Sequence, residues 1–549
     1  MNNARRLWAS YGGVLCLLAV GLAPFAARPF FFDDGSVVAS AAASAKNPWR
    51  PYDFTLDLAA PREPAWPAGG RPVYTHPPLN AWLLSLPFQA AGPREIPFHL
   101  TMFLVSLASL WAARKLARRW IPSVSERAAA FLLASPVFFL TSLTLYPHLP
   151  YLALFCLAIF SLSALIDGER LAKIRFVAFG VCLAAAALTL HQWPMLIVLA
   201  ILLLWRRPTS DRPIPWRGLA WSLGVFVLLY GGWCAWEAHV YGSFQLLASY
   251  FVRAGGHEGY PWRASFLPLV FFAGGCPVAG VAWIALVKES RPAALALAAT
   301  GGIGFLIFHG PAGGFTAVQS AELAVFLATG LAFLGALVPF YKKGPRMDRT
   351  LALWFLLEFL FVQKFLAFPA GHHLLTLTLA GVFIAARWTE RLGIRRRWVA
   401  AGWAASFVFT LALAQADYSQ ARVGVRAAAT IPLPNPGKSF YWGNEFGGFE
   451  YYLKRAGWLP WDIRRRPEPG DCLLISRNMN ASGPVAPLRA ARWEKVSLSP
   501  FFQSNPLRTF SLGASAGWYS ASWGALPYSF AAGPVDEFAL IRCADASGN

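Results

Sequence analysis

The feature that most constrains the fold is a long series of apolar stretches separated by short polar loops. An α-helix needs about 20 apolar residues to cross the hydrocarbon core of a bilayer, so each stretch is a candidate transmembrane helix. About thirteen stretches meet this description, and together they predict an all-α polytopic membrane domain. They are 8–28, 95–113, 128–146, 149–166, 174–190, 192–205, 218–236, 265–287, 293–309, 319–340, 350–367, 372–387 and 398–415.

The composition agrees with a membrane protein. Hydrophobic residues make up 56% of the 549 residues and charged residues only 14%, whereas soluble proteins carry about 25% charged residues. The formal net charge is +21, but the basic residues form short clusters between apolar stretches, which argues against a nucleic-acid partner. Arg5 and Arg6 precede an apolar run that is long for a signal peptide, so we expect a retained first helix.

Every second loop is basic, which predicts the orientation of the chain. Basic residues that flank apolar stretches face the cytoplasm in membrane proteins. The expected cytoplasmic clusters are at 5–6, 114–127, 170–175, 206–217, 288–291, 342–349 and 387–397. The segment 29–94, the loop 237–264 and everything after about residue 416 should therefore face outward. All 9 histidines then fall on the outer half, which suggests a polar cavity on that side and places any chemistry there.

Two outward regions carry their own structural signals. In segment 29–94, Asp34 is a suitable N-cap for a helix over "GSVVASAAASAKN", and "THPPLNAWLLSLPFQAAG" predicts a helix lying on the membrane surface. After residue 417 the composition becomes polar, and residues 418–549 predict a small outward α/β domain with short strands. Cys472 and Cys543 lie in this domain, where an oxidising compartment would permit a disulfide.

Four outward features could carry chemistry. They are the pair Asp33-Asp34 after the first stretch, His76 before Pro77-Pro78, the segment with Arg253 and His257, and Lys364 with His372 and His373. Two acids before a helix also act simply as caps and dipole partners, and we assign that role to Asp34. Arg253 and Lys364 could alternatively extend to the membrane interface. Glu358 is an acid within an apolar stretch and therefore a further functional suspect.

Two of these motifs resemble those of a known protein family. "FFFDDGSVVASAAASAKNPWRPYDF" followed by "VYTHPPLNAWLLSLP" resembles the first outer loop of membrane glycosyltransferases of the GT-C fold. The branch that it is most similar to holds the protein O-mannosyltransferases and the lipid A aminoarabinose transferases. Members of that branch share an early acidic pair, a Lys-Pro-Pro or His-Pro-Pro before a surface helix, and an outward C-terminal domain. The resemblance covers the topology of the whole chain and the motifs mainly of residues 25–90.

The resemblance implies transfer of a sugar from a polyprenyl-phosphate donor to a lipid, glycan or protein acceptor on the outer side. A carboxylate can take the proton of the attacking hydroxyl, and cations can stabilise the phosphate leaving group. By this resemblance Asp33 and Asp34 are the catalytic candidates. The expected substrate-binding residues are His76, Arg253, His257, Lys364, His372 and His373. Membrane lipids are the other expected partners.

The sequence departs from the aminoarabinose branch where that branch binds metal. Thr75 replaces an acid that helps to hold the metal, and Tyr250 replaces a metal-binding histidine. We therefore assign no metal ligand and no certain cofactor, while a divalent metal stays open. No Walker A, GxGxxG or Ser-His-Asp pattern indicates a nucleotide or hydrolase site.

Two other classes of protein fit part of the pattern. A secondary transporter would show broken helices and a repeat between its halves, and neither is evident in the sequence. A polytopic ligase or acyltransferase acting on envelope glycans shares the outward histidines, but it does not predict the pairing of Asp-Asp with His-Pro-Pro. The sequence favours the glycosyltransferase.

Overall fold

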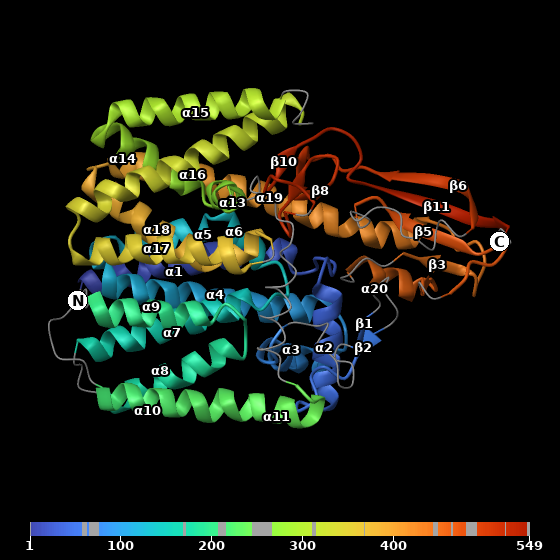
Figure 1. Ribbon diagram of the computed structural model, residues 1–549, viewed down its shortest axis with the longest axis horizontal. Helices are drawn as coiled ribbons and strands as arrows, with labels where there is room; N and C mark the ends of the chain where they lie inside the picture. The colour runs from blue at the N-terminus through green and yellow to red at the C-terminus, as the bar shows by residue number, and fades with distance from the viewer. Residues whose placement is uncertain are drawn as a thin grey trace.

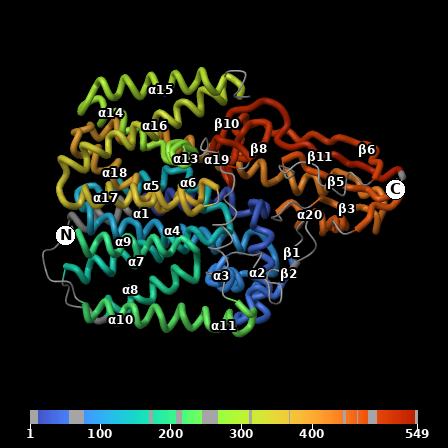
Figure 2. The backbone as a smooth tube through the Cα atoms, in the orientation of Figure 1, coloured from blue at the N-terminus to red at the C-terminus, as the bar shows by residue number. Residues whose placement is uncertain are grey.

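The computed structural model describes residues 2–56, 63–64, 76–167, 172–206, 216–243, 266–309, 315–366, 368–442, 448–462, 465–478, 491–521 and 523–545. Most of these residues are helical. Long helices run side by side along the longest axis of the molecule, and a sheet domain extends from one end of them (Figure 1). The N-terminus lies at the opposite end of the helices from the sheet domain, and the C-terminus lies at the far end of that domain (Figure 2).

Over the described residues, the helical part is built from sixteen helices, most of them apolar. They are α1 (Asn2–Leu22), α4 (Glu95–Trp120), α5 (Ser125–Leu133), α6 (Pro136–Thr141), α7 (His148–Ile166), α8 (Ala172–Ala187), α9 (Pro194–Arg206), α10 (Trp216–Phe226), α11 (Gly232–Tyr241), α13 (Leu267–Gly275), α14 (Val281–Glu289), α15 (Arg291–His309), α16 (Ala317–Lys343), α17 (Arg346–Phe365), α18 (Leu375–Arg391) and α19 (Arg396–Thr430). Helices cover the greater part of each of the thirteen expected stretches.

Fewer of these helices are long enough to cross a membrane unaided. Among the described residues, six helices have the length and apolar composition of a membrane span, or seven if the bent pair α13 and α14 counts as one. Three shorter apolar helices cover Gly12–Phe25, Ile174–Ala187 and Pro194–Arg206. The prediction of a multi-pass helical protein is thus confirmed, while the count of thirteen spans stays a prediction.

Two expected spans are broken, and proline explains both breaks. The stretch 128–146 divides into α5 and α6 at Ser135, whose backbone is extended before Pro136. The stretch 265–287 divides at Cys276 before Pro277, where the two halves are bent by 102°. Proline disfavours helical geometry at the preceding residue and lacks the amide hydrogen that a continuous helix needs.

Basic and acidic residues pair at the helix ends that lie away from the sheet domain. Arg114 of α4 reaches Glu126 of α5 at 2.6 Å. Arg387 and Arg391 of α18 both reach Asp348 of α17, at 3.1 and 2.6 Å. These arginines belong to the clusters 114–127 and 387–397 that are expected on the cytoplasmic side, and that orientation stays a prediction.

The two helices expected in the outer loop are present at the other end. α2 (Asp34–Lys46) and α3 (Leu79–Ala91) pack against each other, and α3 begins directly after Pro78 as the sequence predicts. On α3, Leu86 is 62% exposed although it is apolar, which agrees with a helix that lies on a membrane surface. Strand β1 (Thr55–Leu56) pairs antiparallel with β2 (Glu63–Pro64).

The C-terminal part is the expected α/β unit. Its five-stranded sheet has the order β4-β3-β5-β11-β6, with β3 parallel to β4 and β5, and β11 antiparallel to β5 and β6. The elements are β3 (Ser439–Tyr441), α20 (Gly448–Arg455), β4 (Leu459–Pro460), β5 (Cys472–Ser476), β6 (Arg492–Phe501) and β11 (Asp536–Asp545), with short strands β7 (Leu507–Arg508), β8 (Phe510–Ser511), β9 (Ala516–Gly517) and β10 (Ser529–Phe530) between β6 and β11.

Two details of the C-terminal part differ from a simple separate domain. The expected division at 417/418 falls inside α19, so one continuous helix joins the membrane part to the sheet; the division itself stays a prediction. Cys472 and Cys543 are not joined by a disulfide. Cys472 lies opposite Arg542 in the sheet register, so the neighbouring Cys543 points to the other face.

Candidate functional site

The phenylalanines before the acidic pair are buried rather than exposed to lipid. Phe30, Phe31 and Phe32 are at most 7% exposed. Phe32 has a φ of +55°, a left-handed conformation that is rare for an aromatic residue. Its ring stacks on Tyr519 with centroids 4.7 Å apart and packs nearly perpendicular to the ring of Trp523 with centroids 4.8 Å apart. The C-terminal part thus holds the strained turn that leads into Asp33.

A glycine allows this close contact between distant segments. Gly448, at the start of α20, donates its backbone N–H to the carbonyl of Phe32 at 2.9 Å. A Cβ atom at this position would lie 2.4 Å from the Cα of Phe31. Only glycine lets the two backbones approach this closely without a displacement.

Asp34 is not the helix cap that the sequence predicts. It is the first residue of α2, whose N-cap position is occupied by Asp33, and Asp33 makes no side-chain capping bond. The side chain of Asp34 is fully buried and accepts hydrogen bonds from the backbone N–H groups of Phe31 and Leu145, both at 2.9 Å. It also lies 3.2 Å from the guanidinium of Arg28. Through these contacts Asp34 links the phenylalanine turn to Arg28 and to the backbone at Leu145.

Arg28 is the centre of a buried polar network that sequence reasoning missed. Its guanidinium is 0% exposed and contacts Asp34, the carboxylate of Asp417 at 2.9 Å, and the carbonyl of Leu143 at 3.1 Å. It also donates to the hydroxyl of Tyr519 at 2.9 Å, and that hydroxyl donates to Asp417 at 2.7 Å. One signal was available in the sequence. Arg28 directly precedes the outward segment 29–94, and the short loops expected on the outer side contain few basic residues.

Asp33 is the more accessible of the two acids. It is partly exposed, whereas Asp34 is 0% exposed. An electrostatic interaction links Asp33 to Tyr146, which lies in the connection between α6 and α7. The position of Asp33 at the start of α2 also places it near the partial positive charge of a helix N-terminus, which stabilises a carboxylate. A carboxylate that is both accessible and held by its backbone can meet a substrate.

Three histidines lie together near Tyr146. Possible ligand atoms of His148, His372 and His373 all lie within 4.8 Å of one another. The ring of Tyr146 packs on that of His372 with centroids 4.5 Å apart, which connects the cluster to Asp33. His148 begins α7, and His372 and His373 lie in the short helix η6 (Gly371–Leu374) that precedes α18. The structure therefore brings two predicted residues, His372 and His373, together with His148, and Tyr146 interacts with both this cluster and Asp33.

The other predicted residues are placed with less detail. His76 is partly buried and interacts electrostatically with His372. Lys364 is exposed at the C-terminal end of α17, and no described contact links it to the histidines. Arg253 and His257 lie outside the described residues.

Glu358, whose partner the sequence did not reveal, has a structural environment. It is 2% exposed and accepts hydrogen bonds from Thr376 at 2.9 Å and from the indole of Trp354 at 3.2 Å. Thr376 belongs to α18, so Glu358 joins α17 to α18. These neutral donors satisfy the buried carboxyl group of Glu358, so its burial does not require a role in the candidate site.

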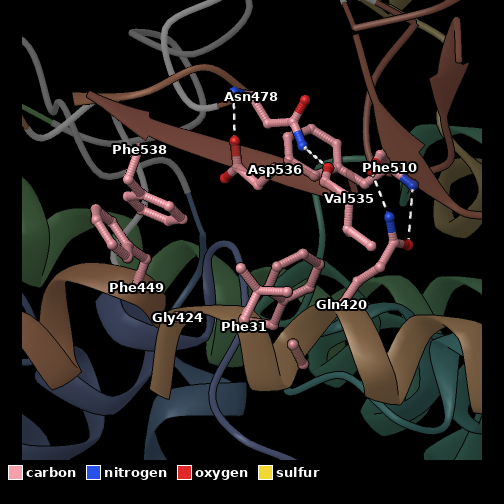
Figure 3. Close-up of a pocket in the computed structure, with 11 residues that line it drawn as sticks. Phe31, Gln420, Gly424, Phe449, Asn478, Phe510, Val535, Asp536 and Phe538 are labelled. Carbon is pink, nitrogen blue, oxygen red and sulfur yellow. Dashed lines mark hydrogen bonds between the residues drawn. The ribbon is translucent and has the colours of Figure 1, made fainter. Parts of the chain in front are cut away.

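A separate pocket lies behind the phenylalanine turn. Phe31 lines it together with Gly424 of α19, Phe449 of α20 and Phe538 of β11, and the close-up in Figure 3 shows these residues around it. Asp536 is the acid of this pocket; it accepts from the hydroxyl of Ser476 and the backbone of Asn478, and burial raises its pKa to about 6. The lining is mainly apolar, so we assign the chemistry to the Asp33 side of the turn.

The arrangement of long apolar helices and a polar site at one end defines a multi-pass membrane protein. Residues 75–230 match the model of one protein family, described as dolichyl-phosphate-mannose-protein mannosyltransferase. This match confirms the resemblance to the protein O-mannosyltransferases for that part of the chain. No curated protein matches the chain.

Solved structures of two membrane glycosyltransferases are similar over most of the chain. ArnT from Cupriavidus metallidurans in the apo state has 15% identity and a TM-score of 0.43, covering 90% of this chain and 97% of its own. ArnT from the same organism bound to undecaprenyl phosphate has 15% identity and a TM-score of 0.41, covering 88% and 96%. A mutant of the arabinofuranosyltransferase AftD from Mycobacteria has 13% identity and a TM-score of 0.42, covering 98% of this chain and 41% of its own.

Proposed function

We propose that this protein is a membrane glycosyltransferase that moves a sugar from a polyprenyl-phosphate donor to an acceptor on the outer side of the cytoplasmic membrane. The observation that carries the proposal is the position of Asp33. This accessible carboxylate interacts with Tyr146, whose ring also packs on His372 of the histidine cluster, and α2, which begins at Asp34, lies at the end of the helices where α3 and the C-terminal part gather. The family match over residues 75–230 supports the same class of reaction.

The proposed reaction uses Asp33 as a general base. The carboxylate takes the proton from an acceptor hydroxyl while that oxygen attacks the anomeric carbon of the donor sugar. The bond between the anomeric carbon and the phosphate oxygen breaks, and the lipid phosphate leaves with the electron pair. Positive charge near the phosphate stabilises this leaving group. His76, Arg253, His257, Lys364, His372 and His373 stay the proposed substrate-binding residues.

The buried network explains why the base can be held in one place. Arg28 is engaged by Asp34 and Asp417, so its charge is already compensated. We assign it to positioning the turn that carries Asp33, and not to the donor phosphate. Preorganisation of this kind lowers the cost of bringing the base to the acceptor.

The test compares Asp33→Asn with wild type in a strain from which the gene has been deleted. Mass spectrometry of envelope lipids, glycans and proteins identifies the species that gains a sugar when the wild-type gene is restored. We expect Asp33→Asn to lower its formation by about 10²–10⁴-fold, the usual contribution of a general base. Asp53→Asn is the matched control, because Asp53 lies in the same outer loop but its side chain is 44% exposed.

Both variants must be inserted at wild-type levels, which is checked by immunoblotting of washed membranes. Full product formation by Asp33→Asn would refute the proposed role of this residue. Absence of any sugar-bearing product that depends on the restored gene would refute the glycosyltransferase itself.

A further inference from the structure

The histidine cluster has the composition and geometry of a metal site. The ring centroids are 4.6 Å apart for His148 and His372, 5.4 Å for His148 and His373, and 4.4 Å for His372 and His373. In a tetrahedral zinc site the Zn–N distances are about 2.0–2.1 Å, so the nitrogens lie about 3.4 Å from one another. Since the ligand atoms here are all within 4.8 Å, small side-chain rotations would complete such a site.

The backbone around the cluster holds the histidines in place. Gly371 donates its N–H to the carbonyl of Trp518 at 2.7 Å, and a Cβ at Gly371 would lie 2.4 Å from the indole of that tryptophan. The side chain of Gln192 reaches the carbonyl of His373 at 3.4 Å. The η6 turn is therefore pressed against two other segments, which limits the motion of the two histidines that it carries.

The hydrogen bonds of the rings fit metal ligands. The Nδ1 atom of His373 lies 3.1 Å from the backbone carbonyl of Phe368. If Nδ1 carries the proton and donates it there, Nε2 is the free ligand atom, and metal-bound histidines commonly show this arrangement. The Nδ1 atom of His372 is buried and has no hydrogen-bond partner among the described residues. A buried polar atom without a partner is costly, and a bound cation would remove that cost.

The charge around the cluster favours a cation over an anion. Three protonated imidazoles this close would repel one another, and burial further disfavours their charged forms. Neutral imidazole is the form that binds metal. Among the described residues, the neighbouring network holds the carboxylates of Asp34 and Asp417 against the guanidinium of Arg28, which leaves an excess of formal negative charge. A dication would balance that excess.

We propose that His148, His372 and His373 bind a divalent transition-metal ion, with Zn²⁺ the best match to three imidazole ligands and one further position open to an oxygen ligand. This ligand set is separate from Thr75 and Tyr250, where the sequence resemblance locates its metal. His373 is partly exposed while the other two are buried, so the site is accessible from one side. The open position would take a phosphate oxygen of the sugar donor, and this last step rests on the proposed function.

The experiment measures metal binding directly, without any assay of sugar transfer. Full-length protein purified in detergent is treated with a chelator, desalted and titrated with Zn²⁺ by calorimetry, and with Co²⁺ by visible absorption. We expect one Zn²⁺ per chain and Co²⁺ bands of a low-symmetry, tetrahedral-type site. His372→Ala and His148→Ala should each weaken Zn²⁺ binding by at least about a hundredfold.

His309→Ala is the control, because His309 is an exposed histidine at the end of α15. It should bind Zn²⁺ like wild type. Gel filtration and circular dichroism identify any variant that has lost its fold, and in that case His372→Gln and His148→Gln replace the alanine variants. The proposal is overturned if wild type binds no Zn²⁺, if the cluster variants bind it equally well, or if His309→Ala weakens binding as much as they do. Activity of Asp33→Asn would refute the proposed reaction while leaving this metal result intact.

Discussion

Arg28→Met tests whether the buried network holds the site together. Methionine has a similar length to arginine but no charge and no donor, so the substitution leaves the carboxylates of Asp34 and Asp417 without their cation. Each carboxylate keeps two neutral donors: two backbone N–H groups for Asp34, and the hydroxyls of Thr509 and Tyr519 for Asp417. Breaking a buried ion pair costs about 3–5 kcal/mol. Because those donors remain, we expect Arg28→Met to destabilise the fold by about 3–5 kcal/mol in total, and not by that amount for each of the two carboxylates.

The assay is equilibrium unfolding in mixed detergent micelles, followed by tryptophan fluorescence. Arg50→Met is the matched control, because Arg50 pairs with Asp53 on the surface, where the two side chains are 54% and 44% exposed. Surface pairs contribute at most about 1 kcal/mol. If Arg28→Met is no more destabilising than Arg50→Met, the network does not stabilise the fold in the way argued.

Two further variants separate the charge from the shape of the arginine side chain. Arg28→Lys keeps the positive charge but loses the planar fork that reaches several acceptors, so its cost should be intermediate. Asp417→Asn combined with Arg28→Met removes one of the stranded carboxylates and should recover part of the lost stability. A double variant that is less stable than Arg28→Met would contradict the ion-pair explanation.

Three other outcomes follow from single contacts. Gly448→Ala should destabilise the fold by about 1–3 kcal/mol in the same unfolding assay, because its Cβ would overlap the backbone of Phe31, whereas Gly513→Ala, with no atom within 4 Å of the added carbon, should not. Gly371→Ala should displace the histidine turn from the indole beneath it and reduce product formation by about tenfold to a hundredfold; wild-type activity would show that this packing is not needed. The folded pKa of Asp536 is about 6, above its ordinary 3.8, so its contribution favours the folded state at low pH and is lost as pH rises from about 4 to 6, by at most about 3 kcal/mol. Asp536→Asn should flatten this part of the profile of thermal midpoint against pH, and an unchanged profile would refute the assignment.

The parts of the fold that depend on local sequence could be predicted. The apolar stretches, α2, α3 and the mixture of helix and short strands after residue 417 depend on periodicity, proline and composition, which are visible in short windows. The prediction of continuous helices over 128–146 and 265–287 was wrong, although Pro136 and Pro277 were visible in the sequence. The prediction was based on the length of the apolar stretch, whereas a single proline decides whether the helix continues.

The parts of the site that depend on distant segments could not be predicted. Arg28 and Asp417 are separated by 389 positions, and nothing in either neighbourhood indicates the other. The same holds for His148 and the pair His372-His373. The assignment of Asp34 as a cap was wrong partly for this reason, because a nearby helix start is a local signal, whereas the backbone N–H of Leu145, which donates to Asp34, lies 111 positions away.

The C-terminal part belongs to the site as much as to the sheet. Trp518 accepts the N–H that anchors the histidine turn, and the next residue, Tyr519, contacts Arg28, Asp417 and the ring of Phe32. Two consecutive residues therefore hold both the carboxylate turn and the histidine turn. A movement of this segment would therefore act on both turns. A division of the chain at residue 417 describes the sequence, but the proposed site draws on residues from both sides of it.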